Sequence, residues 1–283
     1  MKKKEGYIFM GFGKKYVDEC KMCAEMVHSW DKKRPKALLT STKDYEYAKQ
    51  FDIFDDVVTI DFEKESYLKD EKNPHNLYCV IPRVLMPKYM PYDKVLALDS
   101  DIACISDPER IWSYLNERDN CFDCCGYDYE SDWHWGKVQA IVDNLGKEIP
   151  SIHGGVLFFN KTKDNFNKYY KDCLEILEKY TEYKCLNMFR GGMTDEVIFS
   201  IAMAKQNLLP MNYVKFPVVS FNIPYGTQLP CNFHTRNGAK RDTWVKCASP
   251  IIFNHIFFHE GNNQEYYRWF LNFHDYITKK CRH

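Results

Sequence analysis

The 283-residue chain lacks an excess of charge of either sign, long apolar runs and low-complexity segments. It has 39 Lys+Arg against 39 Asp+Glu, whereas dedicated nucleic-acid binders usually carry a basic excess. No segment approaches the roughly 18 consecutive apolar residues that a membrane-spanning helix needs. The apolar stretch Tyr7–Met10 is also too short for the hydrophobic region of a signal peptide. We therefore expect a soluble, cytoplasmic protein that binds no nucleic acid and has no membrane span.

Apolar and aromatic residues are plentiful, at 45% and 16% of the chain, which excludes wholesale disorder and suits one large α/β domain. The 12 cysteines are expected to be free thiols, because the sequence shows no export signal. Two pairs have the CxxC spacing, Cys20/Cys23 and Cys121/Cys124, but they are far apart in sequence. A zinc site would require both pairs to converge, so zinc is not expected.

In the first hundred residues, segments with strand periodicity alternate with segments of helical periodicity. Strands are predicted over 6–10, 36–40, 56–60 and 94–98, and helices over 16–30, 43–51 and 76–86, with a kink at Pro82. Strands that alternate with helices predict a parallel sheet with right-handed crossovers. Ligands of such sheets bind beyond the carboxyl ends of the strands.

The second half of the chain predicts strands over 156–159 and 249–258 and helices over 166–177, 195–204 and 265–278. Thr162 and Thr194 are expected to cap two of these helices. No linker separates the two halves, so we expect one domain over residues 1–283.

The sharpest motif is Asp99-Ser100-Asp101, which follows the apolar strand Val95–Leu98 directly. Carboxylates at positions i and i+2 of an extended segment point to the same side. Such oxygen ligands suit a hard divalent cation, Mn²⁺ or Mg²⁺, which can stabilise the charge on a departing diphosphate. Because Asp-Ser-Asp is also good turn chemistry, a plain turn is the alternative.

This segment resembles the DxD element of GT-A-fold glycosyltransferases. The wider pattern, from Tyr7 to Gly261, is similar to the retaining family 8, which contains glycogenin, galactinol synthase and bacterial lipopolysaccharide galactosyltransferases. The resemblance implies an α/β GT-A fold, Rossmann-like, with a mostly parallel nucleotide-sugar-binding sheet and helices on both faces. It also implies an Mn²⁺ or Mg²⁺ cofactor and a UDP-sugar donor. In that family the DxD carboxylates and a late His bind the cation. The resemblance assigns this role to Asp99, Asp101 and His255, with His259 as the alternative for the late His.

Further segments match the family in order. The opening loop, which cradles uracil and ribose in the family, corresponds here to Met10, Gly11, Phe12, Gly13 and Tyr16. The family usually has Thr and Asn where this chain has Gly11–Gly13, but glycines after a strand do let the backbone approach a ligand closely.

Three other segments are expected to contact the donor. Arg83 stands where the family carries a basic residue near the donor sugar and phosphate, and its guanidinium can fork two hydrogen bonds. The segment that touches the sugar in the family corresponds to His153, Gly154 and Gly155, with His153 in place of Asn or Asp. A late family segment ends here at Gly261, which is also expected to contact substrate, although the Lys that follows in the family is absent.

The segment Gly191–Val197 resembles the family's Asp-Gln segment at the start of a helix. Asp195 is therefore expected to hold donor hydroxyl groups, and Glu196 stands in the place of the Gln that faces the anomeric carbon. A carboxylate can act as a nucleophile or stabilise an oxocarbenium ion better than an amide can. Acidic residues at this position also suit the helix dipole.

We predict a metal-dependent glycosyltransferase that moves a sugar from a UDP-sugar to a glycan or other hydroxyl acceptor. The resemblance implies retention of anomeric configuration. Arg83, Asp195 and Glu196 are the expected catalytic residues, and Ser100 is expected to contact substrate. Residues 1–101 would bind the nucleotide-sugar, and 102–283 would bind the acceptor and perform catalysis. A nucleotidyltransferase, a non-catalytic sugar-nucleotide-binding protein and a phosphohydrolase are the alternatives. The sugar, the acceptor and the oligomeric state are left open, a homodimer included.

Overall fold

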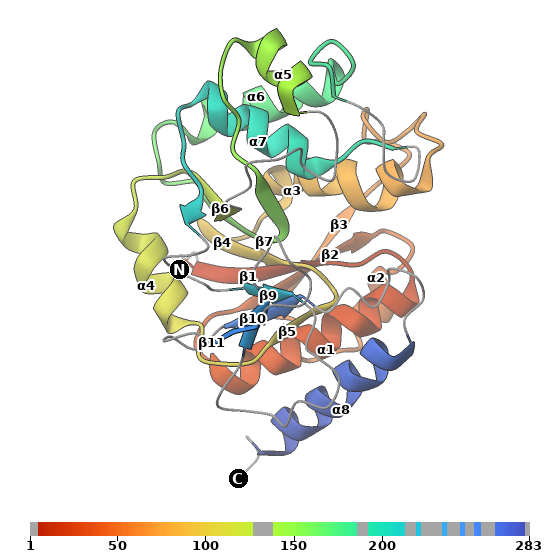
Figure 1. Ribbon diagram of the computed structural model, residues 1–283. Helices are drawn as coiled ribbons and strands as arrows, with labels where there is room; N and C mark the ends of the chain where they lie inside the picture. Colours follow the sequence, from red (N-terminus) through yellow and green to blue (C-terminus); the bar gives the residue numbers. More distant parts are fainter. Residues whose placement is uncertain are drawn as a thin grey trace.

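The computed structural model describes residues 5–126, 138–185, 192–212, 219–221, 234–236, 244–246, 252–255 and 264–280. Its centre is a seven-stranded sheet with helices on both faces (Figure 1). The strands lie in the order β3 (Asp56–Ile60), β2 (Lys36–Ser41), β1 (Glu5–Met10), β4 (Lys94–Leu98), β7 (Ile152–Asn160), β6 (Phe122–Gly126) and β8 (Met211–Asn212).

The sheet is mostly parallel, as the sequence predicts. β1 to β4 all run in one direction, and β6 pairs with β8 in parallel. β7 is antiparallel to both of its neighbours, β4 and β6. Because β7 runs backwards, its first residues lie at the edge where β4 ends, and Val156 is paired with Leu98. This reversal brings the start of β7 to the carboxyl ends of the parallel strands.

Alternate residues of the central strands enter two separate cores. Tyr7 and Phe9 of β1 pack with α1 (Lys14–Trp30), α2 (Tyr45–Ala48), α4 (Glu109–Glu117) and α8 (Gln264–Lys280). Ile8, which points to the other face, packs with α3 (Ile81–Tyr89), α5 (Val138–Leu145), α6 (Phe166–Glu178) and α7 (Asp195–Lys205). This period of two is the ordinary geometry of a strand that is buried on both faces. Figure 1 shows the two helical layers on opposite sides of the sheet.

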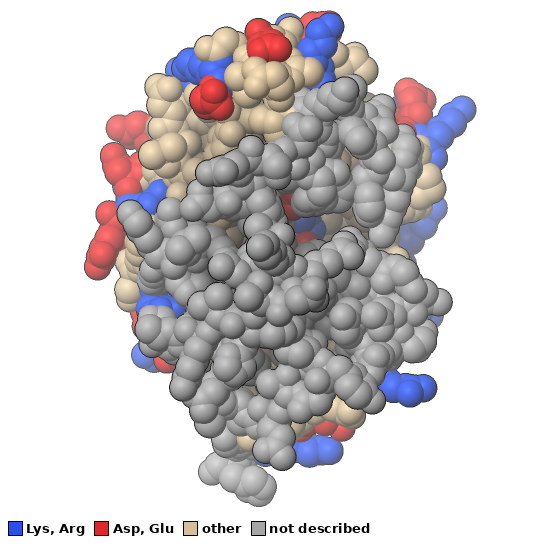
Figure 2. Space-filling model, in the orientation of Figure 1, with Lys and Arg blue, Asp and Glu red and all other residues tan. Residues whose placement is uncertain are grey.

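Smaller sheets accompany the main one. β12 (Phe253–His255) lies between β5 (Ile102–Cys104) and β9 (Val219–Phe221). β12 is antiparallel to β5, and His255 is paired with Ile102, the residue that follows Asp101. β10 (His234–Arg236) and β11 (Trp244–Lys246) form a separate pair. On the face that Figure 2 shows, acidic and basic side chains of the described residues are interspersed, in keeping with the zero net charge.

Some predicted elements differ from those in the structure. The helix expected over 43–51 is only the four residues of α2, because hydrogen bonds from Gln50 to Tyr47 and from Phe51 to Ala48 tighten the chain into a turn. Residues 76–86 are helical, but the segment begins as the π-helix η1 (Asn76–Val80) before α3. Of the strand predicted over 249–258, the described residues form β12.

Of the two predicted helix caps, Thr194 stands at the N-cap position of its helix and Thr162 does not. The Thr162 hydroxyl donates to Asn160 Oδ1 at 2.6 Å, and α6 begins later, after Asn165. Thr194 does precede α7 in an extended conformation, but its side chain makes no capping hydrogen bond. In the described part of the chain the cysteines are free thiols, as expected. Among the described helices, none combines the length and apolar character needed to cross a membrane.

Candidate active site

A cavity of about 1000 Å³ lies at the carboxyl ends of the parallel strands. It receives residues from the ends of β1, β2, β3 and β4, from η1 and α3, from the start of β7 and from the start of α7. Cavities of this size accommodate cofactors and drug-sized ligands. The position agrees with the rule that open α/β sheets bind ligands beyond the carboxyl ends of their strands.

The turn from β1 into α1 forms one wall of the cavity. Gly11 leaves no room for a side chain, since an added Cβ would lie 2.8 Å from the Tyr16 carbonyl oxygen. Gly13 adopts a φ of 88°, which side chains rarely allow, and its N–H donates to Asp44 Oδ2 at 2.8 Å. The Thr40 hydroxyl donates to the Gly11 carbonyl at 2.7 Å. Hydrogen bonds to the main chain of Gly11 and Gly13 therefore hold the turn against the end of β2 and the residues that follow it.

Arg83 of α3 lies at the centre of the charged part of the cavity. Its Nη2 donates to Asp99 Oδ1, and its Nη1 lies 3.2 Å from Asp195 Oδ2. Nη1 also donates to the Gly154 carbonyl at 3.0 Å. One guanidinium thus links the end of β4, the start of β7 and the start of α7. The side chains of Arg83, Asp99 and Asp195 are each less than a fifth exposed, so these charges act in a partly desolvated setting.

Glu196 completes this arrangement from the first turn of α7. Its Oε1 accepts a hydrogen bond from the Gly154 N–H at 2.7 Å, and the residue is 7% exposed. Glu196 lies in the first turn of α7, and the amino-terminal end of a helix favours negative charge. An added Cβ at Gly154 would lie 3.1 Å from Glu196 Cγ, so the glycine allows this close contact. Glu196 therefore offers an oriented carboxylate to the cavity.

An aromatic group forms another part of the cavity lining. The ring of Phe12 lies 5.0 Å from that of Phe62, edge to face, and the ring of Tyr78 lies 5.6 Å from that of Phe62. Tyr78 is 45% exposed, and all three residues line the cavity. Aromatic faces bind flat or apolar surfaces such as a nucleobase or one side of a sugar ring.

The structure gathers nearly all of the candidate residues into this one cavity. Its lining includes, from the sequence prediction, Met10, Gly11, Phe12, Gly13, Tyr16, Arg83, Asp99, Ser100, Asp101, His153, Gly154, Gly155, Asp195 and Glu196. Gly261 lies outside the described residues. For His255 the structure describes the main chain in β12 but not the side chain.

Sequence reasoning missed other lining residues. They follow the ends of β2 and β3 or lie in and before η1: Ser41, Thr42, Lys43, Asp44, Asp61, Phe62, Glu63, Asn73, Pro74, His75, Tyr78 and Cys79. The first seven could have been nominated, because both strands were predicted and ligands bind beyond strand ends. The residues around η1 carry no such signal, since only the fold brings that helix to the cavity.

The residues present fit a hard divalent cation. Asp99 and Asp101 both line the cavity and supply carboxylate oxygens, the ligands that such cations prefer. The main chain of His255 is paired with that of Ile102, beside Asp101. Within the described residues, no three His, Cys, Asp or Glu side chains are grouped closely enough to hold a metal. A cation bound by Asp99 and Asp101 would therefore need at least one further ligand, such as the His255 side chain or an oxygen atom of the substrate.

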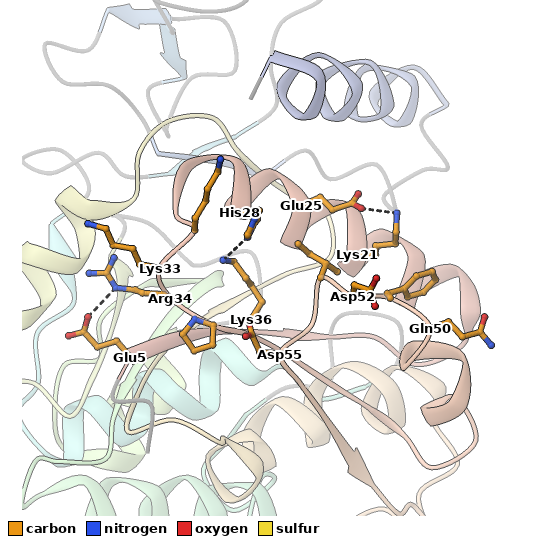
Figure 3. Close-up of a pocket in the computed structure, with 14 residues that line it drawn as sticks. Glu5, Lys21, Glu25, His28, Lys33, Arg34, Lys36, Gln50, Asp52 and Asp55 are labelled. Carbon is orange, nitrogen blue, oxygen red and sulfur yellow. Dashed lines mark hydrogen bonds and ion pairs between the residues drawn. The ribbon is translucent and has the colours of Figure 1, made fainter. Parts of the chain in front are cut away.

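A second cavity, of about 800 Å³, lies near the opposite ends of the strands (Figure 3). Several of its polar and charged side chains contact neighbouring groups. Lys36 Nζ donates to the Asp31 carbonyl at 2.6 Å and lies 3.2 Å from His28 Nδ1, and Lys21 lies 3.0 Å from Glu25. Burial and the nearby charge of Lys36 lower the pKa of His28. We assign no function to this cavity.

Comparisons with known proteins agree on one class. The model of a family described as glycosyl transferase family 8 matches residues 7–195. A crystal structure of the galactosyltransferase LgtC with donor and acceptor sugar analogues is similar, with a TM-score of 0.60 and 15% identity over 95% of each chain. An active-site mutant of LgtC gives a TM-score of 0.60 and 13% identity over 95% of this chain and 94% of that chain.

Mouse xyloside xylosyltransferase 1, in its apo form, gives a TM-score of 0.57 and 11% identity over 89% of this chain and 97% of that chain. These likenesses confirm the predicted α/β GT-A fold. A comparison with curated protein sequences found no match.

Proposed function

Because the chain belongs to glycosyltransferase family 8 and is a glycosyltransferase, we propose that it transfers a sugar from a UDP-sugar to a glycan or other hydroxyl acceptor, with retention of anomeric configuration. The observation that carries this proposal is the convergence of Asp99, Asp101, Arg83 and Glu196 on one cavity at the carboxyl ends of the strands. The bond that breaks joins the anomeric carbon of the sugar to a diphosphate oxygen. This arrangement provides a cationic group for the diphosphate and an anionic group for the anomeric carbon.

The nucleotide is assigned to the wall that the β1–α1 turn forms. The turn presents backbone from Met10 to Gly13 with little side-chain bulk, which allows close approach of a ligand. The aromatic group of Phe12, Phe62 and Tyr78 adds ring faces beside it. We assign residues 1–101 to donor binding, and residues 102–283 to acceptor binding and catalysis.

The diphosphate is assigned to the part of the cavity around Arg83. Arg83 can bind phosphate oxygens through two N–H groups, as guanidinium groups commonly do. Asp99 and Asp101, with His255, would hold Mn²⁺ or Mg²⁺. When bound, such a cation would supply positive charge to the departing diphosphate.

Glu196 is assigned to the anomeric carbon. As the bond from this carbon to the diphosphate oxygen breaks, positive charge develops on the sugar ring. The Glu196 carboxylate, oriented by the Gly154 N–H, would stabilise that charge as an ion partner or form a transient covalent bond. Asp195 and His153 line the cavity beside it and would orient sugar hydroxyl groups.

Substitution of Asp101 tests the proposal. We expect Asp101→Ala to lower the rate of UDP release from a UDP-sugar and acceptor by at least about 100-fold. The substitution removes one of the two carboxylates assigned to the cation, and the cation would supply positive charge to the departing diphosphate. UDP formation and proton NMR of the glycosidic product are the measurements, and circular dichroism checks the fold. Asp52→Ala, at the second cavity, is the matched control and should keep wild-type turnover.

Three results would contradict the proposal. They are wild-type turnover by Asp101→Ala, full activity of the wild type in excess EDTA, and an inverted linkage in the product. Release of pyrophosphate in place of UDP would favour the nucleotidyltransferase alternative.

A further inference from the structure

The Cys23 side chain lies directly beneath the turn that carries Asp99 and Asp101. Cys23 belongs to the buried side of α1 and is 1% exposed. Its Sγ lies 3.0 Å from the Ser100 carbonyl oxygen and 2.9 Å from the Ile102 carbonyl oxygen, as a donor to both. The Asp99 carbonyl lies slightly farther away, at 3.8 Å. One thiol thus lies near the carbonyl groups of three residues of the turn, Asp99, Ser100 and Ile102.

The turn has the cavity on one side and α1 on the other. Its main chain is held by two hydrogen bonds, from Asp99 N to the Gly155 carbonyl at 3.1 Å and from Ile102 N to the Asp99 carbonyl at 3.2 Å. The side chains of Asp99 and Asp101 line the cavity. The Ser100 carbonyl, which precedes Asp101, and the Ile102 carbonyl, which follows it, both lie next to the Cys23 thiol.

The chemical state of Cys23 suits this contact. A thiol S–H is a hydrogen-bond donor, and both carbonyl oxygens lie within its reach. An apolar side chain of similar volume would fill the space but would leave the carbonyls without this donor.

We infer that Cys23 is a positioning residue for the reaction: its thiol holds the Ser100 and Ile102 carbonyls so that both carboxylates of the turn face the bound cation. This inference rests on the proposed function, because it assigns the Asp99 and Asp101 carboxylates to a cation. Ligands of a metal site work only when their supporting contacts hold them in place, and losing such a contact commonly costs 10- to 100-fold in metal affinity.

The test compares three variants by Mn²⁺ affinity in the presence of UDP, measured from the electron paramagnetic resonance of free Mn²⁺. Cys23→Ala removes the donor and should weaken Mn²⁺ binding at least about tenfold. Cys23→Ser keeps a donor and should stay within about threefold of wild type, since its hydroxyl can reach the same carbonyls.

Cys104→Ala is the matched control. Cys104 is another buried thiol, 1% exposed, and its Sγ donates to the Ser106 carbonyl at 3.4 Å, which lies outside the turn. It should lose thermal stability as Cys23→Ala does but keep wild-type Mn²⁺ affinity. The inference is overturned if Cys23→Ala binds Mn²⁺ as the wild type does, or if Cys23→Ser binds as weakly as Cys23→Ala.

Hydrogen exchange separates this inference from the proposed function. The Ile102 amide, which closes the turn, should exchange faster in Cys23→Ala than in Cys104→Ala or Cys23→Ser, with no metal present. If the wild type binds no Mn²⁺, the metal assignment of the proposed function fails, and the inference as stated fails with it. If Mn²⁺ binds but Ile102 exchange is equal in all variants, only the role of Cys23 is wrong.

Discussion

Arg83 is the side chain that contacts two acidic residues of the cavity, Asp99 and Asp195. It contacts Asp99, Asp195 and the Gly154 carbonyl at once. The carboxylate that it neutralises, Asp99, is one of the two assigned to the cation. A positive charge already paired with Asp99 must compete with that cation until a diphosphate offers the guanidinium other oxygens. Arg83 is therefore expected to have opposite effects on metal and nucleotide binding.

Arg83→Gln should bind Mn²⁺ more tightly than the wild type when no nucleotide is present. A partly exposed ion pair contributes about 1 kcal/mol, so the expected gain is roughly fivefold. The same variant should bind UDP less tightly, because a cation near the phosphates is lost. Calorimetric titration with Mn²⁺ alone and with UDP measures both effects, and Arg83→Lys, which keeps the charge, should fall between. Weaker Mn²⁺ binding by Arg83→Gln in the absence of nucleotide would contradict this prediction.

Two elements determine the shape of the site. β7 runs against its neighbours, and so its glycine-rich start lies beside the end of β4, where Asp99 N donates to the Gly155 carbonyl. The β1–α1 turn is compressed around Gly11, whose position leaves no room for a Cβ beside the Tyr16 main chain. Backbone cannot give way as a flexible side chain can, so a larger residue at this position must move the start of α1.

Gly11→Ala tests that packing. The added methyl group would lie 2.8 Å from the Tyr16 carbonyl oxygen, and overpacking of this kind costs about 1–3 kcal/mol. We expect a lower Tm together with weaker UDP binding, because the displaced turn lines the cavity. The control is Gly146→Ala, at a φ of 67° with open space around it and outside the cavity lining. It should lower the Tm through backbone strain and leave UDP affinity unchanged. Unchanged UDP affinity in Gly11→Ala would show that the turn does not contact the nucleotide.

At the scale of the whole molecule, two carboxylates that are withdrawn from solvent, Glu25 partly and Asp31 almost fully, contact groups on other segments. Glu25 Oε2 of α1 lies 2.6 Å from His274 Nε2 of α8, and Asp31 accepts from the Tyr7 hydroxyl and from Arg34. Burial by itself raises the pKa of both carboxyl groups, but these hydrogen bonds outweigh it, so the pKa of Glu25 and that of Asp31 lie below their ordinary values.

The sign of the resulting pH dependence follows from linkage. A carboxyl group whose pKa is lower in the folded state stabilises the fold above its unfolded pKa of about 4, and this contribution is lost as the pH falls through the folded pKa. We expect the free energy of unfolding to change little from pH 8 to pH 6 on account of these groups and to decline below about pH 4.

Urea unfolding at a series of pH values measures this decline. Glu25→Gln should flatten it, because the variant has no proton to gain at that position. Asp123 acts in the opposite sense, since burial raises its pKa, and it should reduce the decline without reversing it. A stability that rises on acidification from pH 6 to pH 3 would contradict the prediction.

The sequence by itself determined the elements and much of the site. The short apolar runs of β1, β2 and β4 predict strands that the structure buries, because a continuous apolar run is typical of a strand covered on both faces. The resemblance around Asp99, Arg83 and Glu196 nominated residues that the structure brings to one cavity. These residues can be recognised from sequence because each is a charged residue in a short motif beside a predicted strand or helix.

Only the tertiary structure decided which distant segments meet. The reversed direction of β7, the approach of η1 to the cavity and the position of Cys23 beneath the Asp99–Asp101 turn depend on contacts between residues far apart in sequence. An apolar-looking helix residue such as Cys23 gives no local sign of the carbonyls it will meet. Hydrogen bonds and packing across the sheet are long-range, and they exist only once the strands have paired.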